Sequence, residues 1–203
     1  MENRTTESKI ILAADRIFTE RGYAATRMRD IATEAAVNLA LINYYFKSKE
    51  NLYAIIMRQK VSQLFENMIP YMNDRSTSLN QKIRLIVETL HDVISKDRNL
   101  PLFVFNELQK KDSKFSAIMP AKQMKNSYIV QQLAEQKPGV KPLHYIINLL
   151  SLIFYPYVVV PMMTRTKIVP AKEINSLLKE RVQLIPEWMN MTLNINQQQN
   201  KNL

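Results

Sequence analysis

Apolar residues recur every three to four positions along almost the whole 203-residue chain, which is the spacing of amphipathic α-helices. The first stripe predicts a helix from about residue 6 to 21, with Thr5 or Thr6 as its N-cap. Gly22 follows this stripe and is suited to end the helix, because glycine accepts a positive φ. The pattern therefore starts as that of an all-α protein.

Two short helical segments come next, one capped by Thr26 and one starting at Asn38 and running to about 45. Helices of this length are marginal in water on their own, so both must pack on another element. The first helix is the nearest partner, and together the three predict a helix-turn-helix unit whose third helix can enter the major groove of DNA. The expected core residues are Phe18, Ile31, Ala35, Val37, Ile42 and Phe46.

The rest of the chain continues the helical pattern. Ser48 is placed to cap a longer helix that reaches about residue 68. Further helices are predicted near 79–96, 100–109, 114–136, 143–163 and 171–192, which makes about nine in all. We expect a helix-turn-helix headpiece at 1–48, a larger helical domain at 49–193 and a disordered, Asn/Gln-rich tail at 194–203.

Composition agrees with an all-α fold. The chain has only two glycines, Gly22 and Gly139, whereas glycine usually makes up ~7% of residues, and a β-rich fold would need many more for its turns. No cysteine is present, which excludes disulfides, thiolate metal sites and thiol nucleophiles. The N-terminal residues lack the apolar core of a signal peptide, so a cytoplasmic location is expected.

The net charge of +10 favours partners such as nucleic acid. The charge does not by itself locate a DNA site, because residues 1–50 hold eight Lys/Arg against seven Asp/Glu. The arrangement of side chains on the third helix is more informative. A helical wheel turns three of them toward the core, Ile42, Tyr45 and Phe46, and four outward, Asn38, Leu39, Asn43 and Tyr44.

In this arrangement the Tyr44 hydroxyl is free to bond a phosphate oxygen, and Lys47 and Lys49 lie where the chain would cross the DNA backbone. Residues 22–56, GYAATRMRDIATEAAVNLALINYYFKSKENLYAII, resemble the DNA-binding region of the TetR family of bacterial transcriptional regulators. The matching positions are Gly22-Tyr23, Thr26, Ile31-Ala32 and the run from Tyr44 to Glu50. The resemblance covers about the first quarter of the chain.

The resemblance implies phosphate contacts from Thr26, Tyr44 and Lys49, and base readout from the outward positions of the third helix. The full set of expected DNA-binding residues is Thr26, Arg27, Asn38, Leu39, Ala40, Asn43, Tyr44, Lys47 and Lys49. The sequence departs from the common family pattern at Leu39, Ala40, Leu41 and Asn43. Because Leu39 and Ala40 suit thymine methyl groups and Asn43 can pair with adenine, an A·T-leaning half-site is expected.

Residues 143–164 hold no charged residue and, as a helix, are long enough to cross a bilayer. The alternative is a helix buried within a protein or an oligomer. Two internal prolines and several polar residues favour this second interpretation, so no association with a membrane is expected.

By the family resemblance, the last two long helices form a four-helix bundle with a second subunit. The expected interface residues are Leu149, Leu152, Ile153, Ile174, Leu178, Val182 and Ile185. Whether Pro186 kinks or ends the last helix is left open.

Aromatic and methionine side chains are frequent in the middle and late helices. They suit an apolar effector pocket, and they equally suit simple core packing. The candidate pocket residues are Phe103, Met119, Met124, Tyr128, Phe154 and Met162. His91 and His144 are interpreted as structural histidines.

No phosphate-binding loop, metal-ligand cluster or nucleophile-base motif occurs in the sequence, so no catalytic residue, metal or cofactor is expected. The resemblance implies a homodimeric repressor that is released from a near-palindromic operator by a small apolar effector. The alternative is a helical protein-interaction module with a vestigial headpiece.

Overall fold

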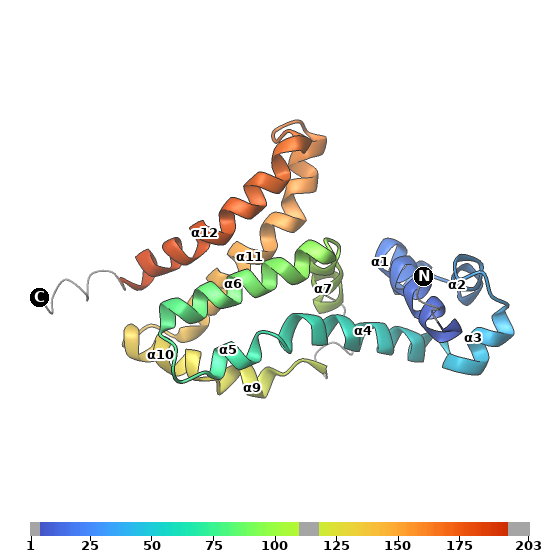
Figure 1. Ribbon diagram of the computed structural model, residues 1–203, viewed down its shortest axis with the longest axis horizontal. Coiled ribbons are helices and arrows are strands. Elements are labelled where there is room, and N and C mark those ends of the chain that lie inside the picture. Colours follow the sequence, from blue (N-terminus) through green and yellow to red (C-terminus); the bar gives the residue numbers. More distant parts are fainter. Residues whose placement is uncertain (1–4, 110–117, 195–203) are drawn as a thin grey trace, which may run out of the picture. The chain divides into compact units, whose positions relative to one another are not determined.

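The computed structural model describes residues 5–109 and 118–194, and these residues contain helices and no strand (Figure 1). The all-α prediction is therefore confirmed for the described part of the chain. The N-terminal helices are α1 (Thr6–Ala25), α2 (Met28–Glu34), α3 (Leu39–Phe46) and α4 (Lys49–Phe65). The following elements are α5 (Ile69–Asn73), α6 (Leu79–Lys96), α7 (Leu100–Leu108), α9 (Ala121–Lys125), α10 (Tyr128–Gln136), α11 (Pro142–Arg165), the 3-10 helix η1 (Ala171–Glu173) and α12 (Ile174–Leu193).

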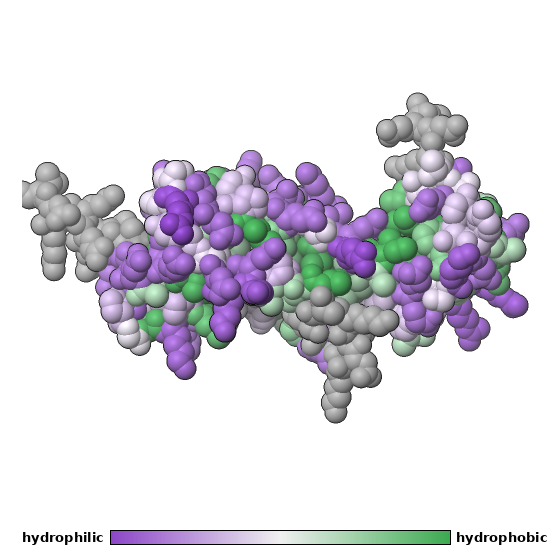
Figure 2. Space-filling view, turned by 90° about the horizontal axis from the view of Figure 1, so that it is seen from below, coloured by the Kyte–Doolittle hydropathy of each residue, from purple (hydrophilic) through white to green (hydrophobic). Residues whose placement is uncertain are grey.

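The chain forms two compact units. The first unit comprises Met1–Ser62 and Glu107–Ile118, and the second comprises Gln63–Asn106 and Met119–Leu203. The division falls within α4, after Ser62. Figure 2 shows hydrophilic side chains over much of the surface that it presents, with smaller hydrophobic areas between them.

The first unit has its own apolar core. Phe18, Ile31, Ile42 and Phe46 are almost fully buried, and Ala35 and Val37 pack against them. Helix α4 adds two buried residues that the sequence analysis did not assign to this core, Leu52 and Ile56. Burial of a side chain of this size contributes roughly 1.5–3 kcal/mol, which explains how α2 and α3, with seven and eight residues, are held in place.

Local capping fixes the ends of the short helices. The Thr5 hydroxyl accepts a bond from the Ser8 amide, and the Asn38 side chain accepts one from the Leu41 amide at 2.7 Å. Gly22 has φ 75° and breaks the regular geometry of α1, as its glycine character predicts. The Ser48 hydroxyl accepts a bond from the Asn51 amide and caps α4.

One predicted helix ends earlier than expected, and another is divided. The segment expected as one helix at 48–68 ends at Phe65, and α5 follows from Ile69. The segment expected at 114–136 is interrupted between α9 and α10, where Ser127 precedes the first residue of α10. Its first residues lie outside the described residues, as do residues 195–203 of the tail that was expected at 194–203.

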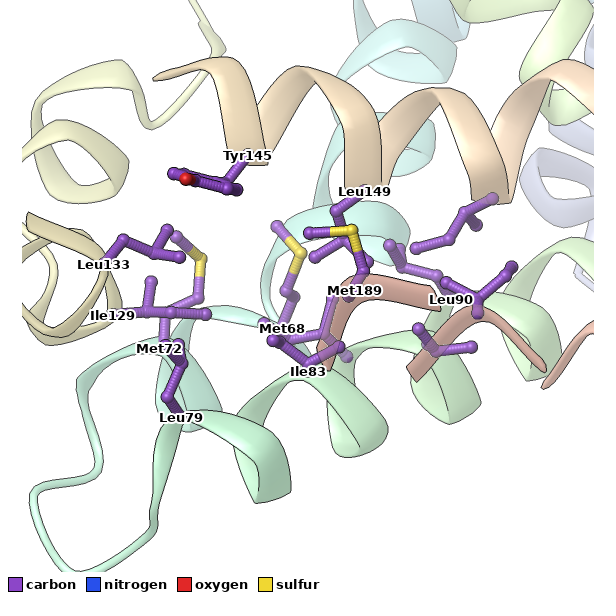
Figure 3. Close-up of a cluster of buried hydrophobic side chains, with 14 of the residues drawn as sticks. Met68, Met72, Leu79, Ile83, Leu90, Ile129, Leu133, Tyr145, Leu149 and Met189 are labelled. Carbon is purple, nitrogen blue, oxygen red and sulfur yellow. The ribbon is translucent and has the colours of Figure 1, made fainter. Parts of the chain in front are cut away.

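The second unit is built around α6, whose buried stripe includes Ile83, Val87, Leu90 and Ile94. Side chains from α5, α10, α11 and α12 complete this core, including three of the labelled residues in Figure 3, Leu133, Tyr145 and Met189. Figure 1 shows α12 folding back beside α11, so that both helices belong to the same unit as α6.

Three prolines lie inside the long helices without ending them. Pro156 and Pro161 lie within α11, and Pro186 lies within α12, which continues to Leu193. A proline lacks the amide hydrogen that would bond the carbonyl four residues earlier. In α11 the Leu152 carbonyl, four residues before Pro156, accepts a bond from the Arg181 guanidinium at 2.9 Å instead. The question left open at Pro186 is therefore answered: the helix runs through it.

Candidate nucleic-acid interface

The α2–α3 junction is a tight turn held by backbone bonds. The Val37 amide donates to the Ala32 carbonyl at 3.0 Å, and Ala36 has a positive φ of 54°. At the start of α2, the Asp30 carboxylate accepts a bond from the Arg27 amide at 2.9 Å. This N-cap is Arg27 and not Thr26, so the sequence-based cap for α2 was wrong.

One side of α3 is exposed, and the opposite side is buried in the core. Ile42 and Phe46 are buried, whereas Asn38, Ala40 and Asn43 are exposed and Leu39 is half-buried. Tyr44 is 71% exposed, which leaves its hydroxyl accessible. The outward direction expected from the helical wheel is thus observed for these residues.

Tyr45 departs from that expectation. The wheel turned it toward the core, but the side chain is 41% exposed and packs edge-on against Tyr44, with ring centroids 5.4 Å apart. The reason is the narrow buried stripe of α3, in which Ile42 and Phe46, one helical turn apart, are the buried residues. Tyr45 lies at the rim of this stripe.

Thr26 is placed in the interior and is corrected as a DNA contact. Its exposed fraction is 1%, and its hydroxyl donates to the Gly22 carbonyl at 2.7 Å. The carbonyl belongs to the last turn of α1, where helical carbonyls lack helical partners. The hydroxyl therefore closes the end of α1 and is not available to a phosphate.

Lys49, like Thr26, donates hydrogen bonds to backbone carbonyls at the end of α1. Its ammonium donates to the Tyr23 carbonyl at 3.1 Å and to the Thr26 carbonyl at 3.0 Å, and it lies 4.2 Å from the centroid of the Tyr23 ring. The Tyr23 hydroxyl donates to Glu50 at 2.5 Å, and burial together with this bond raises the pKa of Tyr23 to about 12. The first turn of α4 is thus attached to the last turn of α1.

Three exposed cations remain beside α3. Arg27, Arg29 and Lys47 make no ion pair with a described carboxylate, and Lys47 lies 5.9 Å from the centroid of the Tyr44 ring. The nearby acids are mostly engaged elsewhere: Arg16 pairs with Glu20 and Glu34, Arg21 pairs with Asp30, and Lys60 pairs with Asp15. This pairing leaves exposed positive groups without an ion pair in a segment whose charge is nearly balanced.

In the second unit, the six predicted pocket residues have different surroundings. Phe103 is buried, Met124 and Phe154 pack against the core, and Met119 is half-buried. Tyr128 lies under the cationic groups of Arg75 and Lys82, and Met162 is 57% exposed. A cleft of about 380 Å³ occurs instead along α6, α11 and α12, and none of these six residues lines it.

The predicted interface residues mostly face the protomer core. Four of them are buried within the protomer: Leu149, Ile153, Leu178 and Ile185. Leu152 and Val182 pack against the same core, and Ile174 is half-buried. The assignment to a subunit interface is therefore corrected for the four residues that are buried within the protomer.

The sequence analysis missed a second apolar stripe on α11. Its exposed members are Leu143, Ile147, Tyr155 and Met162, on the side of the helix opposite Leu149 at ~100° per residue. The signal was the uncharged run itself, since a helix that is apolar on all sides has two faces to cover. Within the described residues, α11 is also the helix that has the length and apolar composition of a membrane span.

Comparisons with known proteins agree with this site. Residues 10–55 match the bacterial regulatory proteins of the tetR family. The chain is 30% identical over 164 residues to the probable HTH-type transcriptional regulator YttP of Bacillus subtilis (strain 168), covering 75% of this chain and 77% of that protein. It is 28% identical over 109 residues to the fatty acid metabolism regulator protein of the same organism, covering 54% and 56%.

Solved structures share the fold. FadR from Bacillus subtilis, determined in complex with stearoyl-CoA, matches with a TM-score of 0.62 at 21% identity, covering 88% of this chain and 97% of that one. An outward-facing third helix on a three-helix core, joined to a larger helical unit, defines a helix-turn-helix transcriptional regulator. The chain belongs to the TetR family of bacterial regulatory proteins, which is a family of regulators and not of enzymes.

Proposed function

We propose that the chain is a homodimeric repressor that binds a near-palindromic operator through α3 and leaves it when a small apolar effector binds. The observation that carries this proposal is the exposure of Asn43 and Tyr44 on a helix whose opposite side is fixed by Phe46. Two such helices about 34–36 Å apart reach successive major grooves on one face of DNA. Residues 1–48 bind the operator, and residues 49–193 bind the effector and the second subunit.

The release mechanism is a shift between two arrangements of the dimer. An effector that binds more tightly to the arrangement unable to span both half-sites lowers the population of the DNA-binding form. Helix α4, which contains the division between the two units, carries this change. The named functions of two relatives, a fatty acid metabolism regulator and a FadR bound to stearoyl-CoA, favour an acyl compound as the effector. The protein then acts in the bacterial cytoplasm, where its operator lies.

The test is operator binding measured by fluorescence anisotropy with DNA from upstream of the gene. Affinity for a phosphate-contacting protein falls steeply as salt rises, so the expected log-log salt slope is several units. A flat salt dependence, or no binding at low salt, would contradict the proposal and favour a protein-interaction module with a vestigial headpiece.

Two substitutions separate the roles within α3. Asn43→Ala is expected to relax the preference at one base pair, since a bidentate pair with adenine discriminates by about 1–3 kcal/mol. Tyr44→Phe removes only the hydroxyl and is expected to weaken all DNA sequences alike by about 1 kcal/mol. Both are measured against a set of operators with single base changes.

Tyr45→Phe is the matched control for Tyr44→Phe, because it makes the same change on the neighbouring exposed ring. It is expected to leave binding unchanged. Equal losses from the two tyrosine variants, or an Asn43→Ala protein with its base preference intact, would refute the residue assignments.

The dimer proposal rests on the exposed stripe of α11. Ile147→Glu places a charge near the middle of this stripe and is expected to convert the dimer to a monomer, because an unpaired charge in an apolar interface is costly. Light scattering after size-exclusion chromatography measures the mass. Gln131→Glu adds the same charge at an exposed position of α10 and should remain dimeric; an Ile147→Glu dimer would place the interface elsewhere.

A further inference from the structure

The cleft along α6, α11 and α12 lies entirely within the second unit. Its outer part has a volume of about 380 Å³, within the range of small-molecule sites. Its inner part is narrow, with about 10 Å³, which is room for roughly one water molecule. The two parts share His91, Tyr157, Leu178 and Val182, so they form one continuous site.

The cleft carries an excess of positive charge. Arg98 and Lys179 line its outer part, Arg181 lines its inner part, and Asp92 is the acid among the lining residues. None of the three cations forms an ion pair with a carboxylate in the described part of the chain. Arg98 donates instead to the neutral Asn175 side chain at 2.6 Å, which spans the mouth between the end of α6 and the start of α12.

Arg181 is held in place by two contacts, but one of its N–H groups has no hydrogen-bond partner among the described residues. One of its terminal nitrogens donates to the Leu152 carbonyl, and its guanidinium carbon lies 5.1 Å from the centroid of the Trp188 ring. Its Nε atom is buried and has no hydrogen-bond partner. A buried donor without a partner is costly, and a guanidinium accommodates a carboxylate or phosphate through paired N–H groups.

A chain of polar groups continues along the cleft wall. The Tyr157 hydroxyl lies 3.0 Å from His91 Nδ1, and His91 Nε2 lies 3.3 Å from the Ser95 hydroxyl. Burial lowers the pKa of His91 and raises the pKa of Tyr157. Both side chains are therefore neutral near pH 7 and supply hydrogen bonds without adding a competing charge.

We propose that this cleft holds the effector as an amphipathic anion, with a carboxylate or phosphate group at Arg181 and its flanking cations, and an apolar body against Leu178 and Val182. The inference rests on the proposed function in calling this ligand the effector, and it replaces the small apolar effector named there by an amphipathic anion. The exposed stripe of α11 lies on the opposite side of that helix from Ile153 and Pro156, which line the cleft. Dimerisation through the stripe therefore leaves the cleft open.

Direct binding to the full-length protein tests the site without DNA. The probes are octanoate, octyl phosphate and the neutral octanol, titrated by calorimetry and by the emission of Trp188, the sole tryptophan, which packs on Arg181. Octanoate or octyl phosphate is expected to bind and octanol is not, and the stronger of the two anions identifies the head group. Octanol binding as tightly as both anions, or no binding of either anion at millimolar concentration, overturns the proposal.

Arg181→Met is expected to weaken anion binding by about tenfold or more, since a charged hydrogen bond is lost. The double variant Arg98→Met/Lys179→Met changes only exposed side chains and is expected to weaken binding even if the first variant folds poorly. Lys172→Met, an exposed lysine of η1 outside the lining residues, is the matched control. If the double variant binds the anion as tightly as the wild type, the proposed site is excluded. If the ligand-free wild type fails to bind the operator, only the proposed function is contradicted, and the anion site is unaffected.

Discussion

Phe46→Ala is expected to unfold the headpiece and abolish operator binding while the second unit stays folded. Phe46 is 1% exposed and lies in the core formed by α1, α2, α3 and α4. Truncation of a buried phenylalanine costs about 3–5 kcal/mol, which is a large part of the total stability of a small domain. The headpiece has too small a core to absorb this loss.

The two units can be observed separately during denaturation. Trp188 lies in α12 of the second unit, so its fluorescence reports that unit, whereas far-UV circular dichroism reports all helices. In the Phe46→Ala protein, the dichroism is expected to show an early loss of helix that the fluorescence does not follow. Tyr45→Ala removes an exposed neighbouring ring and should change stability by only about 0.5 kcal/mol. Equal effects of the two truncations would contradict the observed orientation of α3.

Lys49→Met is expected to destabilise the headpiece by about 2–3 kcal/mol, because the ammonium bonds to two carbonyls at the end of α1 that would lose their donor. The salt slope of operator binding should stay unchanged, since the Lys49 ammonium already bonds those two carbonyls. The measurements are denaturant unfolding and operator affinity at several salt concentrations.

Lys47→Met is the matched comparison, two positions earlier on the chain. Lys47 is exposed and forms no ion pair with a described residue. Its replacement should leave stability intact and reduce the salt slope by about one unit, as expected for one lost phosphate contact. If Lys49→Met instead keeps full stability and loses one unit of slope, Lys49 contacts phosphate after all.

These roles show which features a sequence reveals. The caps formed by Asn38 and Ser48 were predictable because each side chain bonds an amide only three residues away. The burial of Phe46 was predictable because helical spacing places it with Ile42. The hydrogen bonds of Thr26 and Lys49 were not predictable because their partners depend on how the chain folds, and the Lys49 ammonium bonds carbonyls 23 and 26 residues away.

The buried and exposed sides of the helices in the second unit were harder to predict from the sequence, for a physical reason. A run with no charged residue, such as 143–164, gives no polar side from which the buried side of the helix can be deduced. Five of the seven residues chosen as the subunit interface therefore belong to the core that includes α6 or pack against it. The cleft was also not predictable from the sequence, because α6 lies far along the chain from α11 and α12, which contribute most of the rest of its lining.

Pro156 removes one backbone hydrogen bond from α11, and the guanidinium of Arg181 in α12 bonds the Leu152 carbonyl in its place. The backbone of one helix and the side chain of another are thereby interdependent: an amino acid with an amide hydrogen at position 156 would satisfy Leu152 locally and release Arg181 from its anchorage. The side-chain position of Arg181 on α12 therefore depends on which residue stands at position 156 of α11.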